Sequence, residues 1–245
     1  MTKRTYSWKP DVADHRDQIF KNSVRSVNAL PPFVNRIGMD VRIENQGSLG
    51  SCTGNASTSM LEIKLKTNVQ LSRLMAYYNG RVIDGTVKSD DGAQIRSVIK
   101  GLVKNGVSAE KTWPYIISKF DEKPSLKSIE EGAELVAKKT HKYCRVSNLT
   151  GVLENLSKGN TVTFGFSVPS SIDELPESAI LALPTTKDKI VGGHAVLAVG
   201  YDRPNKFVWV RNSWGKEWGI DGYFKMPFGW FTDSRRLVDD MWTFY

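Results

Sequence analysis

The sequence predicts an α+β fold, with helices in the first part of the chain and strands in the second. Between residues 52 and 156 apolar side chains recur at helical spacing, whereas after Gly159 they form β-branched and aromatic runs bounded by turn-forming residues. The two kinds of element hardly alternate, which favours segregated helices and strands over a doubly wound sheet. Because the pattern changes near residues 145–160, we expect two lobes.

Residues 1–40 are the first predicted segment, an arm that wraps over the rest of the chain. They show little periodicity and contain Pro10, Pro31 and Pro32. The apolar anchors of the arm are Tyr6, Trp8, Ile19 and Phe20. Since the rest of this stretch is largely polar, these anchors predict that the arm packs against the body of the protein.

Two helices are predicted in the next part of the chain. The first begins at Cys52, directly after the glycine-rich turn of residues 47–50. The second has the i, i+3, i+4, i+7, i+8 stripe of an amphipathic helix over residues 95–103. Asp91 is its expected N-cap, and Gly106 lies beyond its end.

A third, shorter helix is predicted over residues 149–156, with Asn148 as its cap and Gly159 as its stop. The predicted strands are residues 161–168, 194–201, 207–214 and 223–226. Residues 203–205 should form a hairpin turn between two of these strands. The connection 169–192 spans about 24 residues, and connections of that length are usually functional or decorative.

The composition excludes several classes of protein. The chain has 245 residues, of which 40% are apolar and 24% charged, so wholesale disorder is excluded, and no apolar run is long enough to cross a bilayer. The 34 basic and 26 acidic residues give a net charge of 34 − 26 = +8, but the basic residues are scattered, so no nucleic-acid partner is expected. The N-terminus lacks the apolar region of a secretory signal. With only two cysteines, the fold cannot be one that several disulfide bonds stabilise. We therefore expect a cytoplasmic location, or the host cytoplasm or virion for a viral chain.

Cys52 is the candidate nucleophile. It stands where a glycine-rich turn opens a predicted helix, and there the helix dipole and the free N–H groups favour a thiolate. Taken alone, the position would suit a small buried core residue equally well. Cys144, His15 and His141 match no catalytic motif and are interpreted as structural. Three histidines so widely spaced predict no metal site.

Three other motifs accompany Cys52 in order along the chain. Gln46 precedes it by six residues, His194 opens an apolar strand 142 residues after it, and 18 residues further Asn212 begins the run Asn-Ser-Trp-Gly. In these motifs, which cover roughly residues 30–226, the sequence resembles the papain-like cysteine peptidases. Because four local motifs match in the same order as in that family, the probability that they agree by chance is very small.

The resemblance implies a papain-like two-lobe fold with the active-site cleft between the lobes. The arm of residues 1–40 would precede a peptidase domain of residues 41–245. Within it, a helical lobe would span about residues 41–150 and an antiparallel β lobe about residues 151–245. No cofactor is expected, and the oligomeric state is not predicted.

The resemblance also assigns the catalytic roles. Cys52 would be the nucleophile, and His194 would form an imidazolium–thiolate pair with it and later protonate the leaving amine. Asn212 would orient the imidazole, and Trp214 would shield that hydrogen bond from water. The side-chain amide of Gln46 and the backbone N–H of Cys52 would form the oxyanion hole. The residues expected to bind substrate are Gly92, Gly193 and Trp214.

The sequence departs from the secreted members of this family beside the nucleophile. Leu49 stands where they have a disulfide-forming cysteine, and Thr53 stands where they have a tryptophan. Only about 40 residues precede the core, too few for their inhibitory propeptide domain. Two roles for the arm therefore stay open: it blocks the cleft, or it is part of the fold.

The main prediction is a cysteine endopeptidase that hydrolyses peptide bonds of a protein or peptide substrate through a Cys52 acyl-enzyme. An amidase, isopeptidase or transpeptidase would use the same acyl-enzyme, because the shape of the cleft chooses the acceptor. A non-enzymatic peptide-binding or virion-structural relative is disfavoured, since all four catalytic residues are present. Segment 169–192 runs directly into Gly193 and His194, so we expect it to line one rim of the cleft.

Overall fold

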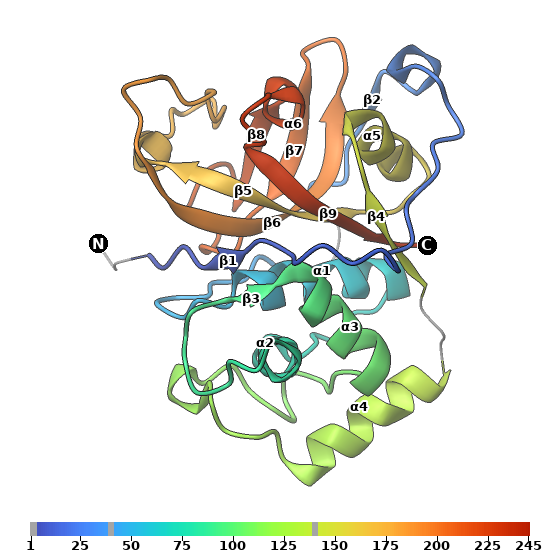
Figure 1. Ribbon diagram of the computed structural model, residues 1–245, viewed down its shortest axis with the longest axis vertical. Coiled ribbons are helices and arrows are strands. Elements are labelled where there is room, and N and C mark those ends of the chain that lie inside the picture. The colour runs from blue at the N-terminus through green and yellow to red at the C-terminus, as the bar shows by residue number, and fades with distance from the viewer. Residues whose placement is uncertain (1–3, 39–41, 139–141) are drawn as a thin grey trace.

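The computed structural model describes residues 4–38, 42–138 and 142–245. Figure 1 shows one lobe built from helices and another built around a sheet, with the N-terminal arm running between them. The helices of the first lobe are α1 (Cys52–Leu65), α2 (Arg73–Asp84), α3 (Ile95–Asn105) and α4 (Leu126–Lys138). This is the α+β two-lobe architecture that the sequence predicts.

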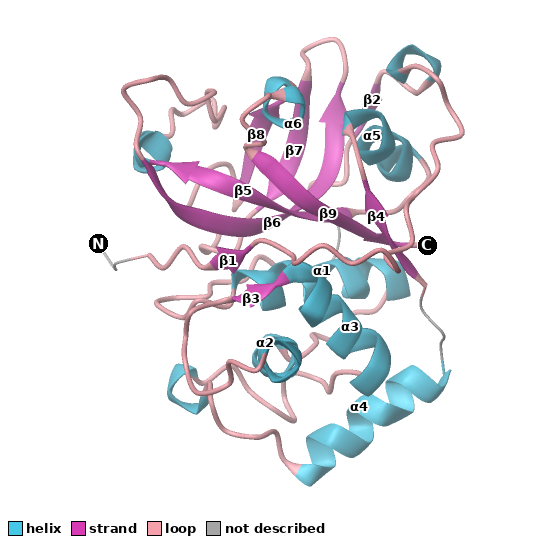
Figure 2. Cartoon of the chain, viewed as in Figure 1, coloured by secondary structure: helices cyan, strands magenta, loops and turns pink. Residues whose placement is uncertain are grey.

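Within the described residues, the second lobe contains a seven-stranded antiparallel sheet (Figure 2). Six strands follow the order β4-β9-β5-β6-β7-β8, and β2 pairs separately with β6. The strands are β2 (Phe33–Val34), β4 (Tyr143–Val146), β5 (Val162–Pro169), β6 (Ile190–Asp202), β7 (Phe207–Arg211), β8 (Tyr223–Pro227) and β9 (Val238–Phe244). Helices α5 (Leu149–Ser157) and α6 (Gly229–Thr232) pack against this sheet.

Helix α1 lies between the lobes and contacts both α2 and β6. Its residues from Cys52 to Ile63 are all buried, and most of their side chains are small. A Cβ at Gly54 would lie 2.8 Å from the carbonyl oxygen of Arg73, so only glycine lets α2 approach this closely. Packing on both sides fixes the first residue of α1 against the sheet.

The sheet positions the other two predicted catalytic residues, His194 and Asn212, next to each other. In the β5–β6 pair, Phe166 stands opposite His194. In the β6–β7 pair, Leu197 stands opposite Arg211, the last residue of β7, so Asn212 follows directly. The register of three strands therefore sets His194 and Asn212 side by side, although 18 residues separate them.

The structure confirms several of the predicted elements. Helix α1 begins at Cys52, and α5 begins after the cap Asn148, whose side chain accepts a hydrogen bond from the Gly151 N–H. The turn at residues 203–206 joins β6 to β7. By contrast, α2, α4, β4 and β9 were not among the predicted elements.

Two expectations need correction. Asp91 is not the N-cap of α3, because residues 93–94 form a short strand, β3 (Ala93–Gln94), and Gln94 takes the cap position. The β lobe also begins before residue 151, since β4 pairs with β9 from residue 143 onward.

The arm is integrated into both lobes. Near its start, β1 (Trp8–Lys9) pairs in parallel with β3 of the helical lobe. Further along, β2 pairs with β6, and Leu30 is buried in the core of the β lobe. In Figure 1 this blue segment crosses the molecule between the helices and the sheet. None of the helices in the described ranges is long and apolar enough to span a membrane.

Candidate active site

Cys52 is held at the first position of α1 by the loop before it. The carboxylate of Asp90 accepts the Gly50 N–H at 3.0 Å and the Tyr77 hydroxyl at 2.7 Å, which ties this loop to α2. The thiol therefore lies at a helix N-terminus, where the helix dipole favours negative charge. Its sulfur also receives a backbone hydrogen bond from Ala195, the residue after His194, so the thiol and the imidazole are neighbours.

The hydrogen bonds of Asn212 define the tautomer of His194. Oδ1 of Asn212 accepts the backbone N–H of Ser213 at 2.8 Å and lies 2.8 Å from Nε2 of His194. Because this oxygen is an acceptor, Nε2 must carry the proton. Nδ1 is buried and has no hydrogen-bond partner among the described residues. In the neutral ring it is therefore a free base beside the thiol.

Trp214 covers the imidazole, as the sequence predicts. The two rings stack with centroids 4.6 Å apart and planes inclined by 26°. Trp218 then packs edge-on against Trp214 at 4.8 Å. This aromatic cover keeps water from the His194–Asn212 hydrogen bond and so strengthens it.

Gln46 is fixed by Ser213, a residue that the sequence did not single out. The Ser213 hydroxyl donates to Oε1 of Gln46 at 2.7 Å, and the Gln46 amide group donates to the Leu49 carbonyl at 3.0 Å. An amide NH₂ has two hydrogens, so one donor stays available for an oxyanion. The position of Ser213 inside the Asn-Ser-Trp-Gly run was the only signal in the sequence.

The N-terminal arm occupies the cleft at the nucleophile. The backbone of Ser7 hydrogen-bonds the sulfur of Cys52, and Ser7 forms a parallel bridge with Gly193. On the other side a Cβ at Gly92 would lie 1.5 Å from the Ser7 carbonyl oxygen. The predicted substrate-binding glycines Gly92 and Gly193 therefore flank the arm, and glycine is required at residue 92.

The first described residues also cover Trp214 beside the nucleophile. Tyr6 packs edge-on against Trp214 at 5.9 Å, and the Arg4 guanidinium lies 4.7 Å from the centre of the same ring. Arg4 also pairs with Asp173, which belongs to the short 3₁₀ helix Ser170–Glu174. Segment 169–192 thus reaches the rim of the cleft at this point.

This closed arrangement shifts both catalytic pKa values. Burial raises the pKa of the Cys52 thiol to about 11, although backbone hydrogen bonds to the sulfur oppose the shift. Burial lowers the pKa of His194 to about 4, against the opposing effect of its hydrogen bond to Asn212. With the arm in place, burial therefore favours the neutral thiol and the neutral imidazole over the imidazolium–thiolate pair that the resemblance implies.

The other cysteine and the remaining histidines lie apart from this site. Cys144 is buried in β4, and burial raises its pKa to about 11. His15 is exposed on the arm, and His141 lies outside the described residues. Within the described residues, no group of three His, Cys, Asp or Glu side chains is arranged to hold a metal ion.

Known proteins resemble this chain along most of its length. A model of the papain family of cysteine proteases matches residues 36–232, which include all four predicted catalytic residues. An uncharacterised peptidase C1-like protein of Acanthamoeba polyphaga mimivirus is 35% identical over 98% of this chain and 77% of its own. Pro-cathepsin H of Bos taurus is 26% identical over 93% of this chain and 68% of its own. The crystal structure of xylellain, a cysteine protease from Xylella fastidiosa, is 35% identical and covers 100% of this chain with a TM-score of 0.88. The match covers 98% of the xylellain chain.

Proposed function

The chain belongs to the papain family of cysteine proteases, and from this premise we propose how its residues hydrolyse a peptide bond. The observation that carries the proposal is the 2.8 Å hydrogen bond between Nε2 of His194 and Oδ1 of Asn212. Asn212 holds that proton on Nε2, so Nδ1 is free to take the thiol proton of Cys52. A substrate is a protein or a peptide.

The reaction proceeds in two halves. The Cys52 sulfur, deprotonated by Nδ1 of His194, attacks the scissile carbonyl carbon. The resulting oxyanion accepts hydrogen bonds from the Gln46 amide and from the Cys52 N–H. His194 then gives its proton to the leaving amine, and the C–N bond breaks to leave a thioester. In the second half His194 takes a proton from water, the hydroxide attacks the thioester, and the released thiol recovers its proton.

We further propose that the arm inhibits the enzyme in its resting state. The backbone of Ser7 lies where the scissile peptide must lie, because it contacts the sulfur between Gly92 and Gly193. The arm also buries Cys52 and so favours the neutral thiol. Activation then requires residues 4–9 to leave the cleft.

Active-site labelling tests both proposals. A peptidyl epoxide directed at cysteine peptidases should label Cys52 slowly in the full chain and much faster in Trp8→Ala, which weakens the arm. Mass spectrometry should locate the adduct on Cys52 and none on Cys144, and His194→Ala should abolish it. Equal labelling of Cys144, or no labelling of any folded variant, would contradict the catalytic assignment. Equal rates for the full chain and Trp8→Ala would contradict inhibition by the arm.

A further inference from the structure

We propose that Tyr115 is a positioning residue for the oxyanion hole, because its hydroxyl ends a chain of hydrogen bonds on the backbone carbonyl of Gln46. The chain runs from Asn55 through Ser51 to Tyr115, beside the loop of residues 46–51 that carries the Gln46 amide to the nucleophile. The inference rests on the proposed function, in which that amide stabilises the oxyanion. Tyr115 acts through Gln46 and not on the substrate.

The donors and acceptors of this chain have one possible order. The Tyr115 hydroxyl donates to the Gln46 carbonyl oxygen at 2.9 Å. A hydroxyl has a single hydrogen, so the hydrogen bond between Tyr115 and Ser51, at 2.5 Å, must be donated by Ser51. The side-chain nitrogen of Asn55 donates in turn to Oγ of Ser51 at 3.0 Å. Each hydroxyl therefore accepts one hydrogen bond and donates the next, and bonds arranged in this way strengthen one another.

Arg73 fixes the first member of the chain. Its Nη1 donates to Oδ1 of Asn55 at 3.1 Å, so the side-chain nitrogen of Asn55 must be the end that faces Ser51. Asn55 and Arg73 are both buried. The same guanidinium lies 4.1 Å from the centre of the Tyr115 ring. The chain therefore has a fixed direction, from a buried cation to the loop of residues 46–51.

The Tyr115 hydroxyl is closer to the Gln46 carbonyl than the backbone of the turn itself is. The nitrogen of Leu49 lies 3.4 Å from this carbonyl oxygen, against 2.9 Å for the hydroxyl. The Gln46 side chain bonds back to the Leu49 carbonyl at 3.0 Å, so the direction of its amide depends on this turn. Without the hydroxyl, the Gln46 carbonyl would lose its shorter hydrogen bond and the amide donor would be less firmly placed. A displacement of about 1 Å can cost a hundredfold in rate.

The surroundings of Tyr115 keep its hydroxyl protonated. Burial raises the pKa of Tyr115 to about 12, against the opposing effects of the hydrogen bond with Ser51 and of the Arg73 charge. The hydroxyl is therefore a donor at neutral pH. The backbone of the residue is held as well, because the Tyr115 N–H donates to Glu110 at 2.8 Å and Glu110 pairs with Arg73 at 3.2 Å.

Tyr115→Phe in the full chain tests the inference, since it removes the hydroxyl and keeps the ring beside Arg73. On a fluorogenic peptide, we expect kcat to fall about tenfold or more with a smaller change in KM, because the oxyanion forms only after substrate has bound. Tyr201→Phe is the matched control. It removes a hydroxyl that donates to the Pro31 carbonyl at 3.1 Å in the β lobe, and it should keep both constants.

Two probes separate the oxyanion hole from the nucleophile. In a peptide aldehyde the Cys52 sulfur adds to the carbonyl carbon, and the aldehyde oxygen then lies where the oxyanion would lie. With iodoacetamide the sulfur displaces iodide and no oxyanion forms. Tyr115→Phe should weaken inhibition by the aldehyde about tenfold and leave the rate of alkylation unchanged. An equal loss with both probes would show that Tyr115 acts on the thiol or on the fold, and would overturn the inference.

Ser51→Ala tests whether the groups act as one chain. This variant removes the donor to Tyr115, so kcat should fall, but by less than in Tyr115→Phe. The double variant S51A/Y115F should be no slower than Tyr115→Phe, because the chain is already broken at its last member. Additive losses would contradict the chain. Ser51→Ala also carries the comparison of the two probes if Tyr115→Phe does not fold.

The outcomes separate this inference from the proposed function. Unchanged kinetics and unchanged aldehyde inhibition in a folded Tyr115→Phe would overturn the inference and leave peptide hydrolysis standing. If the unmodified chain neither hydrolyses a peptide nor binds the aldehyde, peptide hydrolysis fails instead. The inference is then read from amide hydrogen exchange, which should become faster at residues 46–51 in Tyr115→Phe and not in Tyr201→Phe. Equal exchange in the two variants would overturn it.

Discussion

At the scale of single residues, Asn212 is the point on which the chemistry depends. Its side-chain oxygen accepts hydrogen bonds from the backbone N–H of Ser213 and from Nε2 of His194. The imidazole therefore has one tautomer and one orientation. Trp214 then covers this hydrogen bond. In the proposed reaction His194 exchanges protons with the substrate and Asn212 does not, so a change at Asn212 acts through His194.

Asn212→Ala should lower kcat by about tenfold to a hundredfold and change KM much less. The variant loses a buried hydrogen bond that organises the transition state, and a buried partner left unpaired costs about 1–3 kcal/mol. Steady-state kinetics with one fluorogenic peptide would measure both constants. Asn205→Ala, in the exposed turn between β6 and β7, is the control and should leave both constants unchanged. A KM effect larger than the kcat effect would assign Asn212 to substrate binding.

The sequence predicts the catalytic residues better than their surroundings. Cys52, His194 and Asn212 stand in local motifs, and the structure places them together. Ser213 orients Gln46 across 167 positions of the chain, and no local pattern indicates such a contact. The contact between Gly165 and the arm likewise depends on the register of β5 against the path of distant residues.

At the scale of elements, strong periodicity and clear caps decided which helices could be predicted. Helix α3 has a regular apolar stripe, and α5 has the cap Asn148. Helix α2 was missed although Ser72 caps it through the Met75 N–H and Gly85 ends it with a φ of +72°. The capping serine and the terminal glycine are therefore the signals in the sequence that could have predicted α2.

Strand β9 was missed for a physical reason. It contains Asp239 and Asp240 in a run of apolar residues, and Asp240 has a φ of +50° at an irregular point of the β5–β9 pairing. Charged residues and a left-handed residue both lower the strand signal. The Asp240 carboxylate accepts the backbone N–H of Asp11 in the arm at 2.7 Å, a contact that the local sequence does not reveal.

The arm has two functional parts, and truncation should separate them. Deleting residues 2–9 removes the contacts of Ser7 with Cys52 and of Trp8 with Gly165, so we expect kcat/KM to rise at least about tenfold with the fold retained. Deleting residues 1–28 also removes Ser23, whose backbone N–H and hydroxyl both hydrogen-bond the fully buried carboxylate of Glu154. Lys158 still pairs with Glu154 in this variant, but the buried Arg96 loses Asp17. Removing one partner of a buried ion pair is destabilising by about 3–5 kcal/mol, so this variant should lose its cooperative thermal transition.

Activity assays and thermal unfolding followed by circular dichroism would check both truncations. Ile19→Ala, which replaces a half-exposed side chain outside the cleft, is a control for changes in the arm and should alter neither measurement strongly. If the shorter deletion folds but shows no gain in activity, the arm does not inhibit. If the longer deletion folds and is active, the arm is dispensable for the fold.

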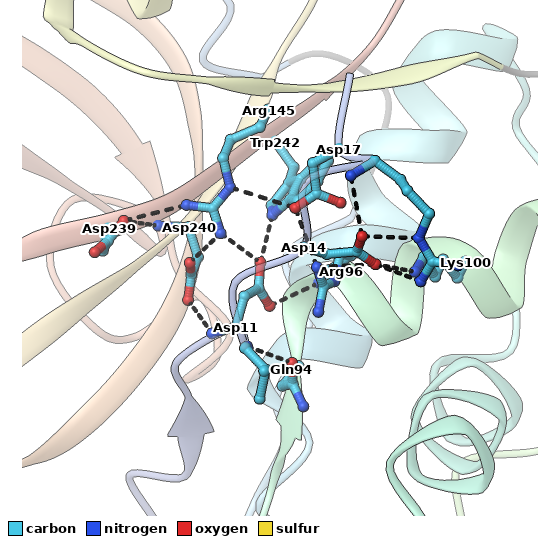
Figure 3. Close-up of polar contacts among 12 residues, drawn as sticks. Asp11, Asp14, Asp17, Gln94, Arg96, Lys100, Arg145, Asp239, Asp240 and Trp242 are labelled. Atoms are coloured by element: carbon cyan, nitrogen blue, oxygen red, sulfur yellow. Dashed lines mark hydrogen bonds and ion pairs between the residues drawn. The ribbon is translucent and has the colours of Figure 1, made fainter. Parts of the chain in front are cut away.

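At the scale of the whole molecule, the arm joins the two lobes through charged groups (Figure 3). Asp17 pairs with Arg96 of α3 at 3.1 Å, and Asp11 pairs with Arg145 of β4 at 3.1 Å. Asp11 also accepts the indole N–H of Trp242 in β9 at 2.7 Å. These contacts hold the middle of the arm, while residues 4–9 cover the nucleophile.

Asp11 makes this connection sensitive to pH. Burial and the neighbouring carboxylate of Asp240 raise the pKa of Asp11 from 3.8 to about 6, against the opposing effects of the hydrogen bond from Trp242 and, less strongly, of Arg145. The folded state therefore binds the proton more tightly than the unfolded chain. The contribution of protonated Asp11 to the stability of the folded state is fully present below about pH 4 and is lost as the pH rises through 6.

Asp11→Asn should remove this dependence. Between pH 7 and pH 5, the free energy of unfolding of the unmodified chain should rise by about 1 kcal/mol relative to that of the variant. Burial also raises the pKa of Glu62, to about 7, and lowers that of His194, to about 4, but both groups are present in both proteins and cancel in the difference. Urea unfolding at the two pH values would measure it.

Asp14→Asn is the control for this prediction, because it removes a carboxylate from the same arm that does not titrate in this range. Its hydrogen bonds with Arg16 hold the pKa of Asp14 well below the ordinary value. The difference between the unmodified chain and Asp14→Asn should therefore be the same at pH 5 and pH 7. If the difference for Asp11→Asn is also constant, or is larger at pH 7, Asp11 carries no extra proton in the folded state. The connection between the lobes would then depend on fixed charges alone.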